Sequence, residues 1–290
     1  MTTDPETSAD SSAEPDPATI LKQKPSEIEE RATGVGEERL DRSPFDMFVT
    51  AVIGGVEVSL GGFAAMAVVG GAIASFPQLD LFAALALGGI AFPVGFLFVV
   101  IGRSELYTEN FLIPVVAVFN RSQPVRSLAK IWTISWAGNM AGCAGIALLL
   151  TAPGTIGHSV LHGYAVYTEH KLSVPIYGVF VSALLAGMIM TVLTWVLLAL
   201  HEAMDRILAI WATGFLVFAT NVSHTVVGAS ILFAGFAEAH RPFWQVLEWL
   251  AVATIGNLVG GVGLVTLFRV VQARSTGRLS ELGRLPGRED

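Results

Sequence analysis

Long apolar runs separated by short polar links extend along the chain from about residue 47 to residue 271. A helix that crosses a membrane needs about 20 mostly apolar residues. Six segments meet this requirement, at 47–75, 81–120, 127–152, 173–200, 206–237 and 244–271. The pattern therefore predicts an all-α membrane protein with six transmembrane helices.

Polar residues interrupt the second and the fifth of these segments. The second contains GRSELYTEN, and the fifth contains TNVSHT. Non-helical backbone is tolerated at membrane depth only where protein surrounds it or where it lines a cavity. We therefore expect each interrupted span to form two half-helices around a short loop inside the protein.

The two halves of the chain carry related patterns. Three pairs of sites match at similar spacings: Asn139 with Asn257 at 118 positions, Leu106 with His224 at 118 positions, and GVEVS (55–59) with GVFVS (178–182) at 123 positions. Because each half holds three spans, the second half must insert upside down, which predicts an inverted 3+3 repeat. In such folds, interrupted helices at corresponding positions mark the transport pathway. The glycines of these patterns also fit close helix packing, which is compatible with a pore.

The composition supports a membrane protein with a separate acidic end. The chain is 53% hydrophobic and 14% charged, whereas soluble domains carry about 25% charged residues. Eleven of the 24 acids precede Ser43, in a stretch too poor in apolar residues to order itself. We therefore predict a disordered acidic tail over 1–44, a transmembrane channel domain over 45–274 and a basic tail over 275–290.

Lysine and arginine predict the orientation in the membrane, because cytoplasmic loops carry an excess of them. One side has Arg39, Arg42, Arg121, Arg126, Lys130, Arg269, Arg274, Arg278, Arg284 and Arg288. The opposite links offer only Lys171 and Arg241. The pattern predicts both termini on the cytoplasmic side of a bacterial-type inner membrane. The single cysteine, Cys143, excludes an intrachain disulfide and a cysteine metal cluster, and no surface resembles a nucleic-acid-binding one.

The segment SELYTEN, facing a second loop that contains a histidine, resembles the formate/nitrite transporter family. The resemblance runs from about Asp46 to Arg274. Its motifs are Leu106, Tyr107 and Thr108 in the first loop, His224 in the second, Lys171 before the fourth span, Trp195 at its far end and RILAIW at 206–211. The resemblance implies an aquaporin-like homopentamer in the lipid bilayer, with one pore through each protomer. It implies passage of small monovalent weak-acid anions such as formate or nitrite, often with a proton. The sequence has no readable cofactor site, so we expect no cofactor.

Several positions depart from the family pattern: Ser223 stands where Glu is common, Gly187 and Gly228 stand where Asn is usual, Arg103 replaces a small residue, and Glu109 follows the loop threonine. These differences leave two alternatives open. One is a neutral small-solute or water channel on the same fold. The other is a non-transporting membrane scaffold or sensor whose acidic tail is the working part. A hydrolase using Ser104 or Ser223 is disfavoured, because neither serine lies in a GxSxG motif, so we expect no enzyme.

His224 and Thr108 are the candidates for the pore and a proton relay. An imidazole can donate, accept or carry a proton near neutral pH, and the Thr108 hydroxyl can orient it from the opposite loop. The alternative is a core histidine bonded to a backbone carbonyl. Lys171 is expected to attract anions at the outer mouth, or else to be an ordinary interfacial lysine.

The remaining candidates are apolar constrictions and intramembrane charges. The resemblance places Leu106 and Tyr107 at one constriction, and Phe215 and Val222 are looser candidates for the other; plain packing is the alternative for each. Charges inside a membrane are costly and call for partners. These charges are Glu57, Arg103, Glu105 and Glu109. We expect Arg103 to pair with Glu57 or a loop acid as an ionic staple, or else to attract the permeating anion.

Overall fold

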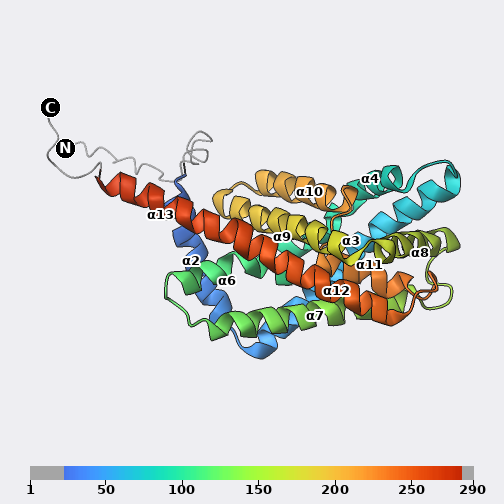
Figure 1. The fold of residues 1–290 in the computed structure, drawn as a ribbon, viewed down its shortest axis with the longest axis horizontal. Helices are drawn as coiled ribbons and strands as arrows, with labels where there is room; N and C mark the ends of the chain where they lie inside the picture. The colour runs from blue at the N-terminus through green and yellow to red at the C-terminus, as the bar shows by residue number, and fades with distance from the viewer. Residues whose placement is uncertain (1–22, 283–290) are drawn as a thin grey trace, which may run out of the picture.

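The computed structural model describes residues 23–282, and every regular element in this part of the chain is a helix (Figure 1). In chain order the helices are α2 (Pro25–Asp41), α3 (Pro44–Ser75), α4 (Leu81–Ala91), α5 (Pro93–Gly102), the 3-10 helix η1 (Tyr107–Phe111), α6 (Ile113–Phe119), α7 (Arg126–Leu150), α8 (His158–Ser173), α9 (Ile176–Ala199), α10 (Ala203–Ala219), α11 (Thr225–Gly235), α12 (Phe243–Leu258), the π-helical η2 (Val259–Thr266) and α13 (Leu267–Leu282).

Within the described residues, five helical stretches are long and apolar enough to cross a membrane: Pro44–Ser75, Leu81–Gly102, Arg126–Leu150, Ile176–Ala199 and Phe243–Thr276. They overlap five of the six predicted spans, and the second predicted span, 81–120, continues beyond Gly102 into η1 and α6. The predicted fifth span divides into α10 and α11, and each of these is shorter than a membrane crossing. The chain is a multi-pass, all-helical membrane protein.

Two non-glycine residues in the left-handed conformation end the helices before the polar loops. Arg103 (φ 58°) follows α5, and Asn221 (φ 54°) follows α10. Residues with a side chain rarely adopt a positive φ, and asparagine tolerates it better than most. The chain therefore leaves the helical path at these positions, which stand 118 apart, the same spacing as Leu106 and His224.

Asn139 of α7 and Asn257 of α12 make matching hydrogen bonds to the two loops. Asn139 accepts from the amide of Tyr107 (2.8 Å) and donates to the carbonyls of Ala51 (2.7 Å) and Glu105 (2.9 Å). Asn257 accepts from the amide of Thr225 (2.8 Å) and donates to the carbonyls of Ala183 (2.9 Å) and Ser223 (2.8 Å). Each buried amide thus fixes the backbone of one loop against a long helix.

Two glycines allow these close contacts. A Cβ on Gly55 would meet the backbone of Asn139, and a Cβ on Gly187 would meet the backbone of Asn257. Gly55 therefore corresponds in its packing to Gly187 and not to Gly178, which contacts only a side chain of its own segment. The predicted match between GVEVS and GVFVS has the wrong register, because short Gly/Val patterns recur at many helical positions.

Helix α2 differs from the disordered tail predicted over 1–44. It packs against α6 and α13 near one end of the bundle (Figure 1). Ile28, Ala32 and Leu40 are buried, and Gly36 lies between them against α6. This spacing of four residues forms a narrow apolar stripe on one helix face. A prediction from composition misses this stripe, because the segment as a whole is acidic. Residues 1–22 of the predicted acidic tail and 283–290 of the predicted basic tail lie outside the described residues.

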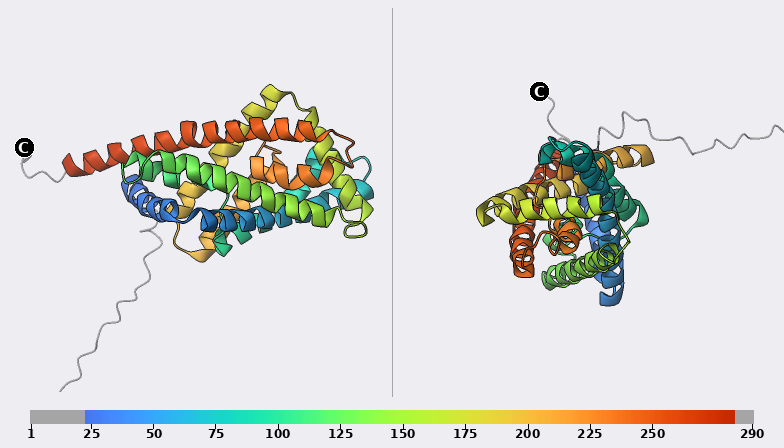
Figure 2. Two further views of the ribbon diagram at one scale, coloured as in Figure 1. Left: turned by 90° about the horizontal axis from the view of Figure 1, so that it is seen from below. Right: turned by 90° about the vertical axis from the view of Figure 1, so that its right-hand side faces the viewer.

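Helices α8 and α11 position the candidate site. The segment 158–173, which lies almost entirely between the third and fourth predicted spans, is helical and packs on α3 and α11. Tyr164, Tyr167, Thr168 and Lys171 form its buried face, at the spacing of successive helical turns. Figure 2 shows the short helix α11, in orange, in the middle of the bundle with longer helices around it.

Candidate functional site

The two polar loops meet at Thr108 and His224. Both residues are fully buried, and Thr108 Oγ1 lies 2.9 Å from His224 Nε2. His224 is also the N-cap of α11, where its Nδ1 accepts from the amide of Val227 (3.1 Å). A neutral imidazole has one donor and one acceptor nitrogen. Because Nδ1 accepts, this contact assigns the hydrogen to Nε2, which donates to Thr108.

A group of three aromatic rings reaches this pair through Phe96 of α5; the others are Phe92, between α4 and α5, and Phe218 of α10. The ring of Phe96 makes an edge contact with His224 at 6.1 Å between centroids. Phe92 stacks on Phe218 at 5.0 Å and contacts Phe96 edge-on at 5.0 Å. Sequence reasoning missed these rings, because phenylalanines that face the protein interior have the same composition signal as those that face lipid.

Phe215 lies elsewhere on α10. It is half-buried, stacks on Trp211 at 5.8 Å and faces Gly89 of α4. Phe218, one turn further along the helix, is the buried ring of α10. The structure therefore brings Phe218, and not Phe215, into the aromatic group around the His224 region.

The other predicted constriction residues line the loops. Leu106 and Tyr107 are buried, and the Tyr107 ring contacts Phe111 edge-on at 4.9 Å. Val222 is half-buried, and its carbonyl accepts from the amide of His224 (3.0 Å). These positions are close in sequence to Thr108 and His224, so the loop backbone brings them to the same region.

Lys171 lies beside the second loop on the side of α8. Its side chain is buried, and its ammonium donates to the carbonyls of Asn221 and Val222 (3.3 Å). The ammonium also lies 5.6 Å from the ring centroid of Tyr167 and 5.8 Å from that of Trp249. Helix α8 is outside the five spanning stretches, and burial lowers the pKa of Lys171 to about 7. The lysine therefore changes its charge near neutral pH.

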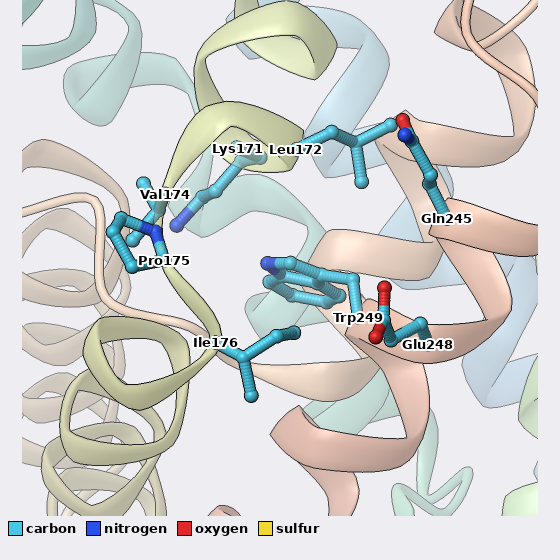
Figure 3. A pocket seen from close by; sticks show the side chains of 8 residues that line it. All are labelled: Lys171, Leu172, Val174, Pro175, Ile176, Gln245, Glu248 and Trp249. Carbon is cyan, nitrogen blue, oxygen red and sulfur yellow. The ribbon is translucent and has the colours of Figure 1, made fainter.

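A cavity of about 190 Å³ opens beside Lys171 (Figure 3). Its lining residues are Lys171, Leu172, Val174, Pro175, Ile176, Gln245, Glu248 and Trp249. They come from the end of α8, the start of α9 and the start of α12. The buried lysine of the predicted anion-attracting site thus faces a space large enough for a small solute.

The acids of the first loop pair with arginines from the end of α2. Arg42 forms an ion pair with Glu105, which is 2% exposed and also accepts from Asn110 (2.5 Å). Arg39 Nη2 lies 3.8 Å from Glu109 Oε2 and donates through Nη1 to Asn110 (3.2 Å). Sequence reasoning missed this cluster, because it assigned the segment carrying both arginines to a disordered tail.

The expected pairing of Arg103 with Glu57 or a loop acid is wrong. Among the described residues, no ion pair joins Arg103 to an acid. Its left-handed backbone closes α5 by donating to the carbonyl of Val99, and its side chain is exposed. Glu57 is half-buried and accepts instead from the hydroxyl of Ser104.

Known proteins match this chain over most of its length. A family model described as formate/nitrite transporter matches residues 26–271. The uncharacterized transporter YrhG of Bacillus subtilis is 26% identical over 252 residues, which cover 84% of this chain and 91% of that protein. The formate channel BtFdhC of Bacillus thuringiensis is 24% identical over 247 residues, which cover 83% of this chain and 92% of that protein.

Solved structures share the fold. A structure described as an FNT family ion channel has a TM-score of 0.74 at 19% identity, covering 85% of this chain and 98% of that chain. A structure described as a pentameric formate channel with formate bound has a TM-score of 0.62 at 17% identity, covering 79% and 96%. With the family match across residues 26–271, these findings show that the chain belongs to the formate/nitrite transporter family.

Proposed function

We propose that this protein is a channel or transporter for small monovalent weak-acid anions, with formate and nitrite as the first candidates. The observation that carries the proposal is the buried contact of 2.9 Å between Thr108 and His224. It joins two loops that each interrupt an apolar segment, as at the pathway of a transporter built from repeats. The formate channel of Bacillus thuringiensis and the formate-bound pentameric structure support this substrate class.

The matching contacts of Asn139 and Asn257 support an inverted 3+3 repeat with two interrupted spans. Each amide holds one loop through a single accepted and two donated hydrogen bonds. The pentameric relative supports a homopentamer with one pore through each protomer. The excess of lysine and arginine on one side supports an inner-membrane orientation with both termini in the cytoplasm.

The proposed passage has apolar walls and one polar position, at His224 and Thr108. Phe96 contacts His224, and Phe92 and Phe218 extend this apolar group. An anion without partners is heavily penalised in such surroundings. Nε2–H of His224 and the hydroxyl of Thr108 are donors that replace water at that point. Lys171 holds positive charge at the approach from α8. We assign the constriction role expected of Phe215 to Phe218, and keep Leu106, Tyr107 and Val222 as its loop members.

Proton coupling through His224 requires a change at the cap of α11. A histidine that gives a proton to an anion must first be an imidazolium, in which both ring nitrogens carry hydrogen. The Nδ1–H of that ring would face the amide N–H of Val227, which now donates to Nδ1. A relay thus breaks this cap, whereas a neutral His224 keeps the cap when its Nε2–H turns from Thr108 to an anion. We propose the neutral donor as the resting state.

Transport assays separate this proposal from the alternatives. Purified protein in liposomes is expected to carry formate and nitrite faster than glycerol or water, and an inward proton gradient reports coupling. Faster glycerol or water flux, with no anion flux, would identify a neutral-solute channel. The scaffold alternative, in which the acidic tail is the working part, is tested by deleting residues 1–22, which leaves helix α2 in place. The channel proposal predicts that anion flux survives this deletion.

A further inference from the structure

Trp249 of α12 carries a buried donor without an acceptor. Its side chain is 2% exposed, and its indole Nε1 has no hydrogen-bond partner. In the part of the chain that the structure describes, it is the only buried side-chain nitrogen in this condition. Leaving a buried donor unpaired is unfavourable, and an indole N–H cannot act as an acceptor. The group therefore calls for an acceptor from outside the chain.

The packing of α11 fixes the position of this indole. A Cβ on Gly228 would collide with the six-membered ring of Trp249, so only glycine permits this contact. Gly228 lies one helical turn after His224 and donates its amide to the His224 carbonyl (2.8 Å). The Trp249 ring thus occupies the space beside α11 that a side chain at position 228 would fill.

The free edge of the indole lies toward Lys171. The Lys171 ammonium is 5.8 Å from the centroid of the Trp249 ring. Figure 3 shows the indole nitrogen on the side of the ring that is nearer to Lys171, whereas the carboxylate of Glu248 lies beyond the opposite side. Both side chains line the cavity of about 190 Å³. Two residues that line this cavity thus carry buried donors, the ammonium of Lys171 and the indole N–H of Trp249.

A small anion satisfies this pair of donors. Its oxygens accept from the indole N–H and from the ammonium, and hydrogen bonds between charged groups and their partners are stronger than neutral ones. The volume of about 190 Å³ equals roughly six water molecules at about 30 Å³ each, which holds such an anion with some of its water. Glu248 is exposed, so solvent and salt weaken its repulsion.

We propose that Trp249 and Lys171 form an anion-binding subsite on the α8 side of the pore, in which the indole N–H donates to an oxygen of formate or nitrite before the anion reaches His224. This proposal rests on the proposed transport function and adds Trp249 as a residue that contacts the anion. A neutral solute is expected to bind this site more weakly than an anion, because it lacks the charge that the ammonium attracts. The subsite therefore contributes to selection of anions.

The direct test is fluorine NMR of protein labelled with 5-fluorotryptophan and titrated with sodium formate. Trp249→Phe identifies the Trp249 signal and removes the N–H while keeping an aromatic ring against Gly228. Trp136 is the matched control, because its indole nitrogen already donates to Thr254 Oγ1 (3.1 Å). The Trp249 signal is expected to shift saturably with formate, and the Trp136 signal is expected to stay. Sodium sulfate at equal ionic strength controls for salt.

Transport by the same variant gives the second readout. Loss of one hydrogen bond to a charged partner predicts a roughly tenfold higher formate concentration for half-maximal flux in Trp249→Phe. An unmoved Trp249 signal in protein with His224-dependent formate flux overturns the subsite and leaves the proposed function standing. An equal response to sulfate, or an unchanged half-maximal concentration in Trp249→Phe, also overturns it. If the unmodified protein carries no anion flux at all, the proposed transport function itself is wrong.

Discussion

Thr108 Oγ1 and His224 Nε2 lie 2.9 Å apart, although the two residues are separated by 116 positions in the chain. Both side chains are fully buried. The contact joins the loop after α5 to the loop before α11, so one buried hydrogen bond connects the two interrupted segments. A buried polar pair of this kind must satisfy its own hydrogen-bonding needs. In the proposed function, the same two groups meet the permeating anion.

Removing the Thr108 hydroxyl tests whether this pair works as a unit. Thr108→Val keeps the shape and leaves Nε2–H of His224 without an acceptor, which costs about 1–3 kcal/mol of stability. We expect formate flux to fall roughly tenfold or more, together with a lower melting temperature in detergent. Thr108→Ser, which retains the hydroxyl, is expected to keep both. Equal flux in the valine and serine variants would contradict a role of the hydroxyl in transport.

The two loop-holding asparagines are expected to be equally important. Asn139→Ala and Asn257→Ala each remove three hydrogen bonds to buried backbone. Each variant is expected to lose about 3 kcal/mol, at about 1 kcal/mol per bond, and both should lose flux. Thermal unfolding measures this, with the exposed Asn120→Ala as control. A large loss in one variant and none in the other would argue against equivalent halves.

The ion pair between Arg42 and Glu105 couples α2 to the first loop. Arg42→Met leaves the Glu105 carboxylate, 2% exposed, without its cation, and such a loss costs roughly 3 kcal/mol. The double variant with Glu105→Gln should recover part of this loss, as a double-mutant cycle would show. Arg241→Met breaks the exposed pair with Glu169 and should cost about 1 kcal/mol or less. If the losses of stability in the two single variants simply add in the double variant, Arg42 and Glu105 are not energetically coupled.

Lys171 predicts a pH dependence of transport. Its pKa of about 7 means that the ammonium is present below this pH and is lost above it. Anion uptake should therefore fall as the pH rises from about 6 to 8, across the titration of this group. The unfolded lysine keeps its proton to about pH 10.4, so the same burial makes stability rise with pH above about 7.

The neighbours of Lys171 define the controls for this profile. The titratable groups near it are His170 and Tyr167 on its own helix and Glu248 across the cavity. Two loop carbonyls and the Trp249 indole also lie close to it. Lys171→Met is expected to give lower uptake with a flat profile over this range, whereas Glu248→Gln should retain the slope. A slope that survives in Lys171→Met would assign the titration to another group.

Periodicity predicted the parts of the fold that follow from local chemistry. Five spans match because about 20 apolar residues have few other stable arrangements in a bilayer. The contact of Thr108 with His224 followed from two polar interruptions that the sequence places at corresponding positions of a predicted repeat. The register of Gly55 with Gly187 did not follow, because it depends on which turn of α3 or α9 approaches an asparagine backbone.

The sequence alone does not show which charged residues pair with one another or which aromatic rings are buried together; these required the three-dimensional structure. Arg42, and not Arg103, meets Glu105, because α2 folds back over the first loop while Arg103 closes α5 with its side chain exposed. The apolar stripe of α2 is only one residue per turn wide, so composition concealed it. Trp249 resembles any tryptophan near a membrane interface in sequence, and only its missing acceptor and its contact with Gly228 distinguish it.

The most direct measurement is formate and nitrite flux into liposomes, with and without an inward proton gradient, for the unmodified protein, His224→Ala and the exposed control His162→Ala. The account predicts flux of both anions that His162→Ala retains and His224→Ala reduces by at least tenfold. Flux that is unchanged in His224→Ala, from correctly inserted protein, would contradict a pathway through the Thr108–His224 contact.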